Sequence, residues 1–393
     1  MRIHVVFVAS SFLFVSLLAS GSDTPNVTML GQLSGTNVGA SSVFGASAII
    51  GHDTIAIGEP TEGNLGAIYI YEKPANGWGS MNQTAILSAS NQCELGQAIA
   101  MSADASTVVS FAGGCSGGGF LGYGWLEVFV RPASGWQNMT QPTAILTLKS
   151  PASVNDFGEY LSISADGQII AATGQIAHKS FVSLFVRPAG GWVNANPNYG
   201  FATPSGLNPV ALSGNNIAVV SNGAVLVFQR GSAGIKQVAT LTASDGNPLS
   251  SRVVIAGGTI VAGAPYDPND TQAPGAAYLF VEPLGGWMNS TETAKMTADG
   301  LAAGAWFGYS LSLSAKNLLV GGYYTSAGYL YTEPATGWLT TSHPTATLTV
   351  SDPDQVNFGR TVAISGSTMV VGDPSESANG NFNGGAAWVF QVQ

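Results

Sequence analysis

Charged side chains are scarce in this sequence. Asp, Glu, Lys and Arg together make up 9% of its 393 residues. Basic residues are the rarer kind, with 12 Lys and Arg against 22 Asp and Glu, so the formal net charge is -10. No basic stripe is present to meet phosphates, and we therefore expect no nucleic-acid partner. The 51 Gly residues and 45% hydrophobic content also argue against a disordered, highly charged chain.

Long apolar runs are also lacking after the N-terminus. The run from Val5 to Leu18 is shorter than the roughly 20 residues that span a bilayer. It follows the positive Arg2 and precedes the small residues Ala19-Ser20-Gly21, which is the pattern of a secretory signal peptide. We therefore predict a signal peptide over residues 1–21 and a secreted protein with no transmembrane anchor. A membrane anchor at this run is the alternative.

Cysteine is nearly absent, since Cys93 and Cys115 are the two that occur. Two cysteines in an extracellular protein favour a disulfide bond, which typically stabilises a fold by about 2–4 kcal/mol. A catalytic thiol is the alternative, but no His is a candidate to activate it. The sequence therefore predicts a disulfide between Cys93 and Cys115.

Catalytic motifs are lacking too. The four His residues form no His-Glu-x-x-His metal motif, and neither a nucleophile elbow nor a phosphate loop is found. The Gly-rich run Gly113–Gly119 has no Lys and no following helix, both of which a phosphate loop needs. Paired carboxylates would suit a glycosidase, which needs two acids about 5–10 Å apart. We expect no enzymatic activity, with a secreted carbohydrate-active hydrolase or lyase as the alternative.

What fills the chain is one segment in seven imperfect copies. The clearest copy has an alternating strand at Thr361–Ser365, an apolar strand that begins at Thr368, and a third strand that ends at Phe390. The copies begin near Phe44, Leu95, Phe157, Leu207, Leu249, Phe307 and Phe358. Repeats of about 40–50 residues that consist of short strands are typical of propeller blades. We predict an all-β fold over residues 22–393, a seven-bladed β-propeller of four-stranded antiparallel blades.

Two further features describe how the blades join. The seventh copy ends after its third strand, and Val27–Leu33 is predicted to supply the missing strand and close the ring. A Pro-x-x-Gly-Trp loop follows the third strand in five copies. Its Trp recurs at a fixed blade position, so we expect it to pack between adjacent blades, with stacking on sugars as the alternative. These loops are Pro74–Trp78, Pro132–Trp136, Pro188–Trp192, Pro283–Trp287 and Pro334–Trp338.

The repeat carries two short motifs. Phe-Gly stands at 44–45, 157–158, 307–308 and 358–359, and a Gly-Ala-Pro element stands at Gly263-Ala264-Pro265, with variants at 58–60 and 372–374. At these residues the chain resembles the FG-GAP repeat family, the propeller unit of integrin α-subunit heads and of many secreted proteins. The resemblance covers nearly all of the mature chain. It implies a seven-bladed propeller and an extracellular protein.

The resemblance has two limits. Integrin-type blades often hold calcium in an acidic Asp-x-Asp-x-Asp-Gly loop between their first two strands. Here that connection is a short turn such as Ser314–Asn317, which has no room for the 6–8 oxygen ligands that calcium prefers. We expect no cofactor; calcium is possible, but the sequence has no motif for its ligands. We also expect no integrin stalk.

Candidate ligand-binding residues gather on one face of the predicted ring. Loops between the second and third strands of a blade, and loops between blades, share this face, which we call the acidic face. Its basic residues are expected to be Lys149 and Lys179. The candidates are Glu59, Glu62, Asp156, Tyr266, Asp267, Asp270, Tyr323, Tyr324, Asp352, Asp354, Asp373 and Glu376. Carboxylates and aromatics suit a carbohydrate or protein ligand. The alternative is that these carboxylates only solvate polar loops.

Glycosylation sequons bear on which face is free. Asn-x-Ser/Thr occurs at Asn26, Asn82, Asn138, Asn269 and Asn289. Three of them follow the Gly-Trp loops, on the face opposite to the acidic one, so glycans there would leave the acidic face open. The sequence therefore predicts a secreted, monomeric binding or adhesion module that recognises an extracellular protein or carbohydrate. A structural protein with no discrete ligand is a further alternative.

Overall fold

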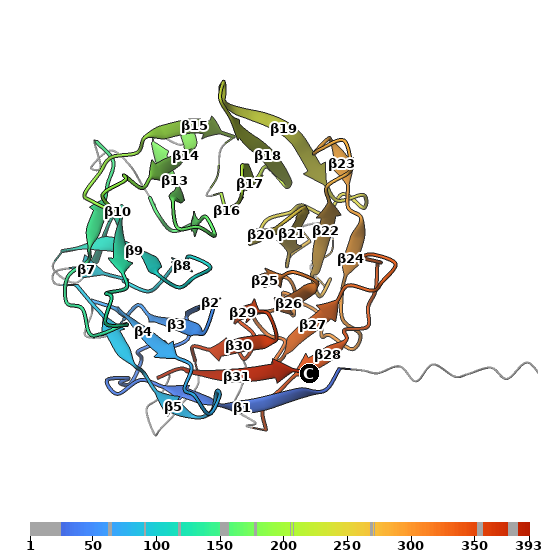
Figure 1. Cartoon of the computed structure of the whole chain (residues 1–393). Coiled ribbons are helices and arrows are strands. Elements are labelled where there is room, and N and C mark those ends of the chain that lie inside the picture. Colours follow the sequence, from blue (N-terminus) through green and yellow to red (C-terminus); the bar gives the residue numbers. More distant parts are fainter. Residues whose placement is uncertain are drawn as a thin grey trace, which may run out of the picture.

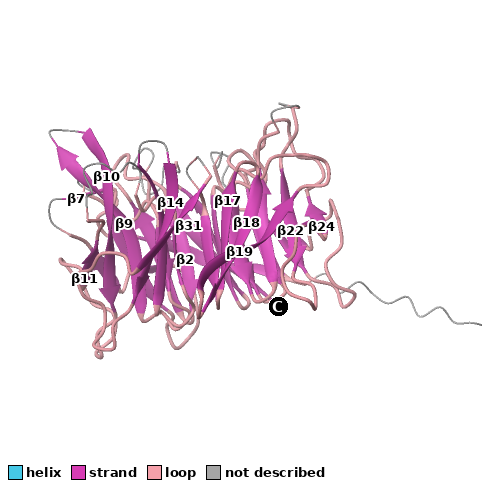
Figure 2. Ribbon diagram, turned by 90° about the horizontal axis from the view of Figure 1, so that it is seen from above, coloured by secondary structure: helices cyan, strands magenta, loops and turns pink. Residues whose placement is uncertain are grey.

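The computed structural model describes residues 25–61, 65–89, 92–116, 119–149, 157–176, 179–204, 206, 208–267, 270, 272–351, 357–375 and 384–393. Every regular element in these ranges is a β-strand. Seven sheets stand around a central axis (Figure 1), which confirms the predicted seven-bladed β-propeller. Figure 2 shows the ring from its side, with strands that run between two loop-bearing faces. The described part of the chain includes no helix long and apolar enough to cross a membrane.

Each blade is an antiparallel sheet whose strands follow one another from the axis to the rim (Figure 1). Blades 1 to 3 consist of β2 (Ser47–Gly51), β3 (Thr54–Glu59), β4 (Ala67–Glu72) and β6 (Ala85–Leu87); of β8 (Ile99–Met101), β9 (Thr107–Ser116), β10 (Gly119–Val130) and β11 (Ala144–Leu146); and of β12 (Leu161–Ile163), β13 (Ile169–Ile176), β14 (Lys179–Val186) and β15 (Tyr199–Thr203).

Blades 4 to 6 have the same order. They consist of β16 (Val210–Ser213), β17 (Asn216–Ser221), β18 (Ala224–Gly231) and β19 (Gly234–Thr242); of β20 (Val253–Ala256), β21 (Thr259–Ala264), β22 (Ala276–Val281) and β24 (Ala294–Met296); and of β25 (Ser310–Ser314), β26 (Asn317–Gly321), β27 (Gly328–Thr332) and β28 (Ala346–Leu348). Three short strands add to sheet edges: β5 (Met81–Asn82), β7 (Gln92–Cys93) and β23 (Ser290–Thr291).

Blade 7 is built from both ends of the chain. Its inner strands are β29 (Thr361–Ser365), β30 (Thr368–Asp373) and β31 (Ala386–Val392), and its outermost strand is β1 (Val27–Ser34). β1 is antiparallel to β31 and also pairs in parallel with β5, where Leu33 faces Met81. The predicted closure of the ring by the N-terminal strand is confirmed (Figure 1).

The hydrophobic core is divided into seven layers, and each layer lies between two blades. One layer joins Val370 of β30 to Ile55 and Tyr69 of blade 1. The layer on the other side of β30 joins Met369 and Val371 to Leu319 and Leu330 of blade 6. Because side chains alternate between the two faces of a strand, both faces of the middle strands are covered. This explains why their sequences are nearly all apolar.

The glycines of the two motifs meet where neighbouring blades join. A Cβ on Gly321 of blade 6 would collide with the carbonyl oxygen of Gly359 in the Phe-Gly pair of blade 7. Gly58 and Gly263 meet the carbonyls of the next blade in the same way. Within blade 7 the amide of Gly359 donates a hydrogen bond to the Gly372 carbonyl, 3.2 Å away. Glycine at both motif positions therefore allows the backbones of adjacent blades to touch.

The five Pro-x-x-Gly-Trp loops each join their blade to the one before it. Trp136 is buried in the layer between blades 1 and 2, and Trp338 in the layer between blades 5 and 6. The expected packing of these Trp residues between blades is confirmed. Two residues after Trp136, the Oδ1 atom of Asn138 accepts a hydrogen bond from the Ile86 amide in the outer strand of blade 1, at 2.9 Å. Asn194 and Asn289 make the equivalent contact in later blades.

Candidate functional site

The structure describes seven of the twelve candidate ligand-binding residues. Glu62, Asp156, Asp352, Asp354 and Glu376 lie outside the described residues. Glu59 and Asp373 are buried in the fold. The other five are Tyr266, Asp267, Asp270, Tyr323 and Tyr324, and they lie in loops of blades 5 and 6.

The placement of Glu59 and Asp373 on the open acidic face is wrong. They are the last residues of β3 and β30 and have no exposed surface. The Oδ1 atom of Asp373 accepts hydrogen bonds from the amide and the hydroxyl of Ser375, at 2.9 and 2.7 Å. Burial raises the pKa of Asp373, against an opposite effect of these bonds and of Arg360. Each residue follows a motif glycine, and at this position the chain is still inside the blade.

Asp267 and Asp270 of blade 5 make hydrogen bonds within their own loop. Asp267 and Asp270 pair through their backbones, with the Asp270 amide 3.2 Å from the Asp267 carbonyl. The Oδ1 atom of Asp270 accepts a hydrogen bond from the Gln272 amide at 3.0 Å, a common use of Asp in turns. No group of three or more His, Cys, Asp or Glu suited to a metal ion occurs among the described residues.

Four aromatic side chains of blade 6 form a cluster. Tyr323 and Tyr324 come shortly after β26, while Trp306 and Tyr309 flank the Phe-Gly pair. Ring centroids lie 5.5 Å apart for Trp306 and Tyr323, 4.5 Å for Tyr323 and Tyr324, and 6.2 Å for Trp306 and Tyr309. Trp306 is 37% exposed and Tyr324 is 54% exposed. Two loops of one face thus present a partly open aromatic surface.

The repeat itself sets the backbone that carries Trp306. Trp306 has a φ of 56°, in the left-handed region, and its carbonyl accepts a hydrogen bond from the Tyr309 amide at 3.1 Å. Val43 and Glu94 occupy the same position in blades 1 and 2, with φ values of 51° and 64° and the same turn bond. The unusual φ therefore belongs to the turn before the first strand. What is particular to blade 6 is the large aromatic side chain.

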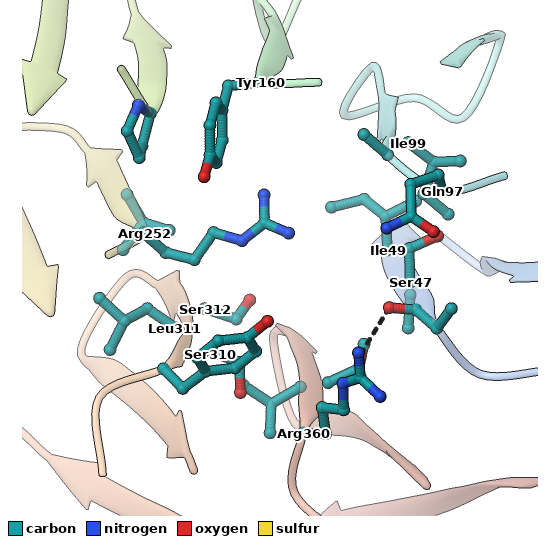
Figure 3. A pocket seen from close by; sticks show the side chains of 18 of the residues that line it. Ser47, Ile49, Gln97, Ile99, Tyr160, Arg252, Ser310, Leu311, Ser312 and Arg360 are labelled. Atoms are coloured by element: carbon teal, nitrogen blue, oxygen red, sulfur yellow. Dashed lines mark hydrogen bonds between the residues drawn. The ribbon is translucent and has the colours of Figure 1, made fainter. Parts of the chain in front are cut away.

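A cavity of about 280 Å³ occupies the centre of the ring. It lies where the first strands of all seven blades begin, so residues close behind each Phe-Gly position line it. Blades 1 to 7 contribute, among others, Ser47, Gln97, Tyr160, Pro209, Arg252, Tyr309 and Arg360. Figure 3 shows this cavity with Arg252 and Arg360 directed into it from two sides.

The two arginines are held by aromatic rings. The guanidinium carbon of Arg252 lies 5.5 Å from the centroid of Tyr160, and that of Arg360 lies 4.6 Å from the centroid of Tyr323. Neither arginine takes part in an ion pair with another described residue. The lining of the central cavity includes no Asp or Glu in the part of the chain that the structure describes. The described lining of this cavity in an acidic protein therefore carries two positive charges and no carboxylate.

A second pocket continues outward from the cavity. It measures about 460 Å³ and is lined by Tyr160, Ser250, Ser251, Arg252, Pro265, Tyr266, Trp306 and Tyr309. Tyr160, Arg252 and Tyr309 line both spaces. We name the two spaces together the arginine-aromatic site. It comprises Tyr160, Arg252, Tyr266, Trp306, Tyr309 and Arg360 of the lining, with Tyr323, which lies behind Arg360 and contacts it.

Sequence reasoning found part of this site and missed the rest. Tyr266 and Tyr323 were expected on this face, whereas Arg252 and Arg360 were not, and only Lys149 and Lys179 were named as basic residues there. Both arginines directly precede the first strand of a blade. A charged side chain at such a position is common at strand ends and does not by itself indicate a site. A signal was present, because Arg360 occupies the place of Ala46 and Gln97 in other copies.

Three segments of the chain match a known protein family. Residues 235–280, 290–332 and 344–390 match the family model of the FG-GAP repeat. Each match begins in or near the outer strand of one blade and runs through the first three strands of the next. The same elements recur in a closed ring of seven blades. These three repeats, within a ring of seven like blades, support an FG-GAP propeller. A search of curated proteins finds no match.

Solved structures resemble this FG-GAP propeller in fold alone. The WD40 domain of coronin from Toxoplasma gondii is 12% identical, with a TM-score of 0.57, and the match covers 94% of this chain and 86% of that one. A putative 6-phosphogluconolactonase from Bacteroides uniformis is 12% identical, with a TM-score of 0.50, and the match covers 78% and 88%. At such identity the site of a relative says nothing about the site here.

The cysteines and sequons of the FG-GAP propeller have these places. Cys93 lies in β7 and pairs with Gly113 of β9, the strand that also contains Cys115. Cys115 was expected in a loop, but β9 and β10 extend beyond the usual length. The side chains of both cysteines lie outside the described part, so the disulfide stays a prediction.

Among the sequons Asn26, Asn82, Asn138 and Asn289 are exposed, and Asn269 lies outside the described residues.

Proposed function

We propose that this FG-GAP propeller is a secreted, monomeric binding module that recognises an extracellular protein or carbohydrate without catalysis. The observation that carries the proposal is the arginine-aromatic site, where Trp306 and Tyr266 are exposed beside the guanidinium group of Arg252. Aromatic and arginine side chains are enriched in recognition sites, because they combine a large contact area with directional hydrogen bonds. The fold adds support, since rings of short loops on a rigid scaffold serve recognition.

The chemistry of the lining favours binding over turnover. Acid-base catalysis uses His, Asp, Glu or a similar group that titrates near the working pH. The described lining of both spaces offers arginine, tyrosine, serine, Gln97, Thr361 and apolar residues, and no carboxylate or imidazole. Burial raises the pKa of Glu127 to about 7, yet its side chain is sealed inside blade 2 and away from this lining.

Two features support an extracellular monomer. Asn82, Asn138 and Asn289 are exposed and lie beside the outer strands at the rim of the ring, so glycans there would not cover the central arginine-aromatic site. The chain closes the ring with its own strand β1, and no second copy is needed to complete a blade.

The test is a binding screen of the mature protein on an array of glycans and matrix proteins, with calcium or with a chelator, in which both retention and released product are read. We expect saturable retention without product, in either buffer, and a clear loss of retention in Trp306→Ala. Leu339→Ala is the matched control, because Leu339 is an exposed apolar side chain that lines neither space of the site. Release of product would replace the binding function by an enzymatic one.

A further inference from the structure

We propose that the arginine-aromatic site binds an acidic saccharide, with the acidic group held by Arg252 and Arg360 and a sugar ring stacked on Trp306. The inference rests on the proposed binding function and deepens it by naming the ligand class. It follows from three properties of the site: its charge, its aromatic surface and its size.

The charge of the site calls for an anion. Two of the 12 basic side chains point into one cavity whose described lining has no carboxylate, in a chain of net charge -10. Two guanidinium groups in one cavity repel each other, and a bound anion removes this repulsion. The planar fork of a guanidinium also matches a carboxylate or sulfate group with two parallel hydrogen bonds.

Both guanidinium groups are already oriented. Arg252 lies over Tyr160, and Arg360 lies over Tyr323, which itself contacts Tyr309 at 5.6 Å between ring centroids. An arginine held over an aromatic ring loses little conformational entropy when a ligand arrives. The rings orient the side chains without neutralising them. Arg360 also acts on the buried carboxyl of Asp373, and Arg252 makes no ion pair with another described residue.

The neighbouring surface suits a sugar. The apolar C–H face of a pyranose packs on an aromatic ring, and Trp306 and Tyr266 line the outer pocket with exposed rings. Sugar hydroxyls require hydrogen-bonding partners, and Ser250 and Ser251 lie in the same lining. A peptide of Asp or Glu residues would satisfy the arginines but would leave this aromatic surface without a matching partner.

The size of the site sets the length of the ligand. The outer pocket of about 460 Å³ falls within the range of about 300–1,000 Å³ that is typical of small-molecule sites. It therefore accepts one or two sugar units rather than a protein surface. The negative net charge of the chain disfavours long polyanions, which would be repelled outside the site. We infer a short saccharide, or the end of a longer one, with one or two acidic groups.

The experiment uses the full mature chain and matched pairs of short oligosaccharides. The acidic members end in galacturonate, glucuronate, sialate or a sulfated galactose, and each is paired with its methyl ester or unsulfated counterpart. Binding is measured by calorimetry and by tryptophan fluorescence. We expect at least one acidic member to bind, and its neutral counterpart to bind at least tenfold more weakly. The pair that responds tells a carboxylate ligand from a sulfate ligand.

Variants locate the binding to the proposed residues. Arg252→Gln and Arg360→Gln are each expected to lower the affinity about tenfold. Arg252→Lys keeps the positive charge but loses the planar guanidinium, so its affinity should lie between those of the natural protein and Arg252→Gln. Arg187→Gln on the opposite face is the control and should leave the affinity unchanged. Trp306→Phe should remove most of the fluorescence change while calorimetry still detects binding. Thermal melting of each variant excludes a general loss of folding.

Three results would overturn the inference and leave the proposed binding function standing. They are equal binding of acidic and neutral members, affinity that is unchanged in both glutamine variants, and binding of an oligo-aspartate peptide in place of every saccharide. Failure of all four acidic saccharides would also overturn it, while retention on the wider array of glycans and matrix proteins decides the binding function separately.

Discussion

Gln32 and Trp388 lie opposite each other in the strand pair that closes the ring, although they come from the two ends of the propeller. Their strands, β1 and β31, supply the outer half of blade 7. Without β1 the edge of β31 would be open, and the layer around Leu33 would lose one side. Closure of the ring thus depends on residues that precede the first repeat.

Deletion of residues 26–35 is expected to destabilise the entire fold. It removes β1 together with the buried Leu33, and it exposes the edge of β31. We expect a clear fall in the melting temperature and a broader transition in calorimetry. Deletion of residues 22–25 alone is the control and should have little effect. A melting temperature that the longer deletion does not change would contradict the role of β1.

Gly321→Ala is expected to lower the free energy of unfolding by about 1–3 kcal/mol, because the added methyl group collides with the Gly359 carbonyl of the next blade. Gly321 does not have a positive φ, so the cost comes from this collision and not from backbone strain. The measurement is the midpoint of denaturant unfolding. Gly190→Ala is the matched control, since nothing lies within 4 Å of its Cβ position. Equal effects in the two variants would argue against the contact between blades.

Glu127→Gln is expected to stabilise the protein at high pH and to have little effect at low pH. Burial raises the pKa of Glu127 from 4.5 to about 7, against a weaker opposite effect of the hydrogen bond from Trp125. The folded state then binds more protons than the unfolded state between these values, so the stability of the natural protein falls as pH rises from about 4.5 to 7. The shift corresponds to at most about 3 kcal/mol.

The measurement for Glu127 is the unfolding midpoint of both proteins at pH 4, 6 and 8. We expect the advantage of the glutamine variant to be near zero at pH 4 and to reach its full size by pH 8. Glu333→Gln, which lies at the end of the third strand of blade 6, is the control. An advantage of the glutamine variant that is the same at all three pH values would contradict the expected titration.

The cysteines of blade 2 are expected to form a disulfide. Cys93 pairs with Gly113, two residues before Cys115 on β9. Such diagonal neighbours have Cα atoms about 7–8 Å apart, slightly beyond the about 4.4–6.8 Å of a disulfide, so the bond would draw the two strands together. The intact mass of the secreted protein should increase by two hydrogen atoms on reduction. Two thiols that react with an alkylating reagent in the unfolded, unreduced protein would refute the bond.

The sequence predicts the blades well because their signals are local. A Phe-Gly pair fixes a turn and a buried side chain, and the apolar second strand shows that both its faces are covered. The error at Glu59 and Asp373 has a local cause as well. In the sequence each position looks like the start of a loop, but each residue is still the last residue of a strand inside its blade and is buried there.

The arginine-aromatic site is harder to predict because it depends on how the ring closes. Arg252 and Arg360 are far apart in the sequence, and each follows its own motif position. They face one cavity only because seven first strands converge on the axis (Figure 3). In the same way, Tyr323 meets Arg360 across the boundary between blades 6 and 7. No spacing along the chain encodes these encounters.

The division of the core into layers between blades affects how the molecule resists force and damage. Each layer belongs equally to two blades, and a blade taken alone would have both of its sides wet. A packing defect in one layer therefore destabilises both blades that share it. Because the ring is closed, the destabilisation can extend to further blades in both directions. Force applied to the N-terminal strand should first separate β1 from β31, and the blades should then unfold one after another, beginning with blade 7.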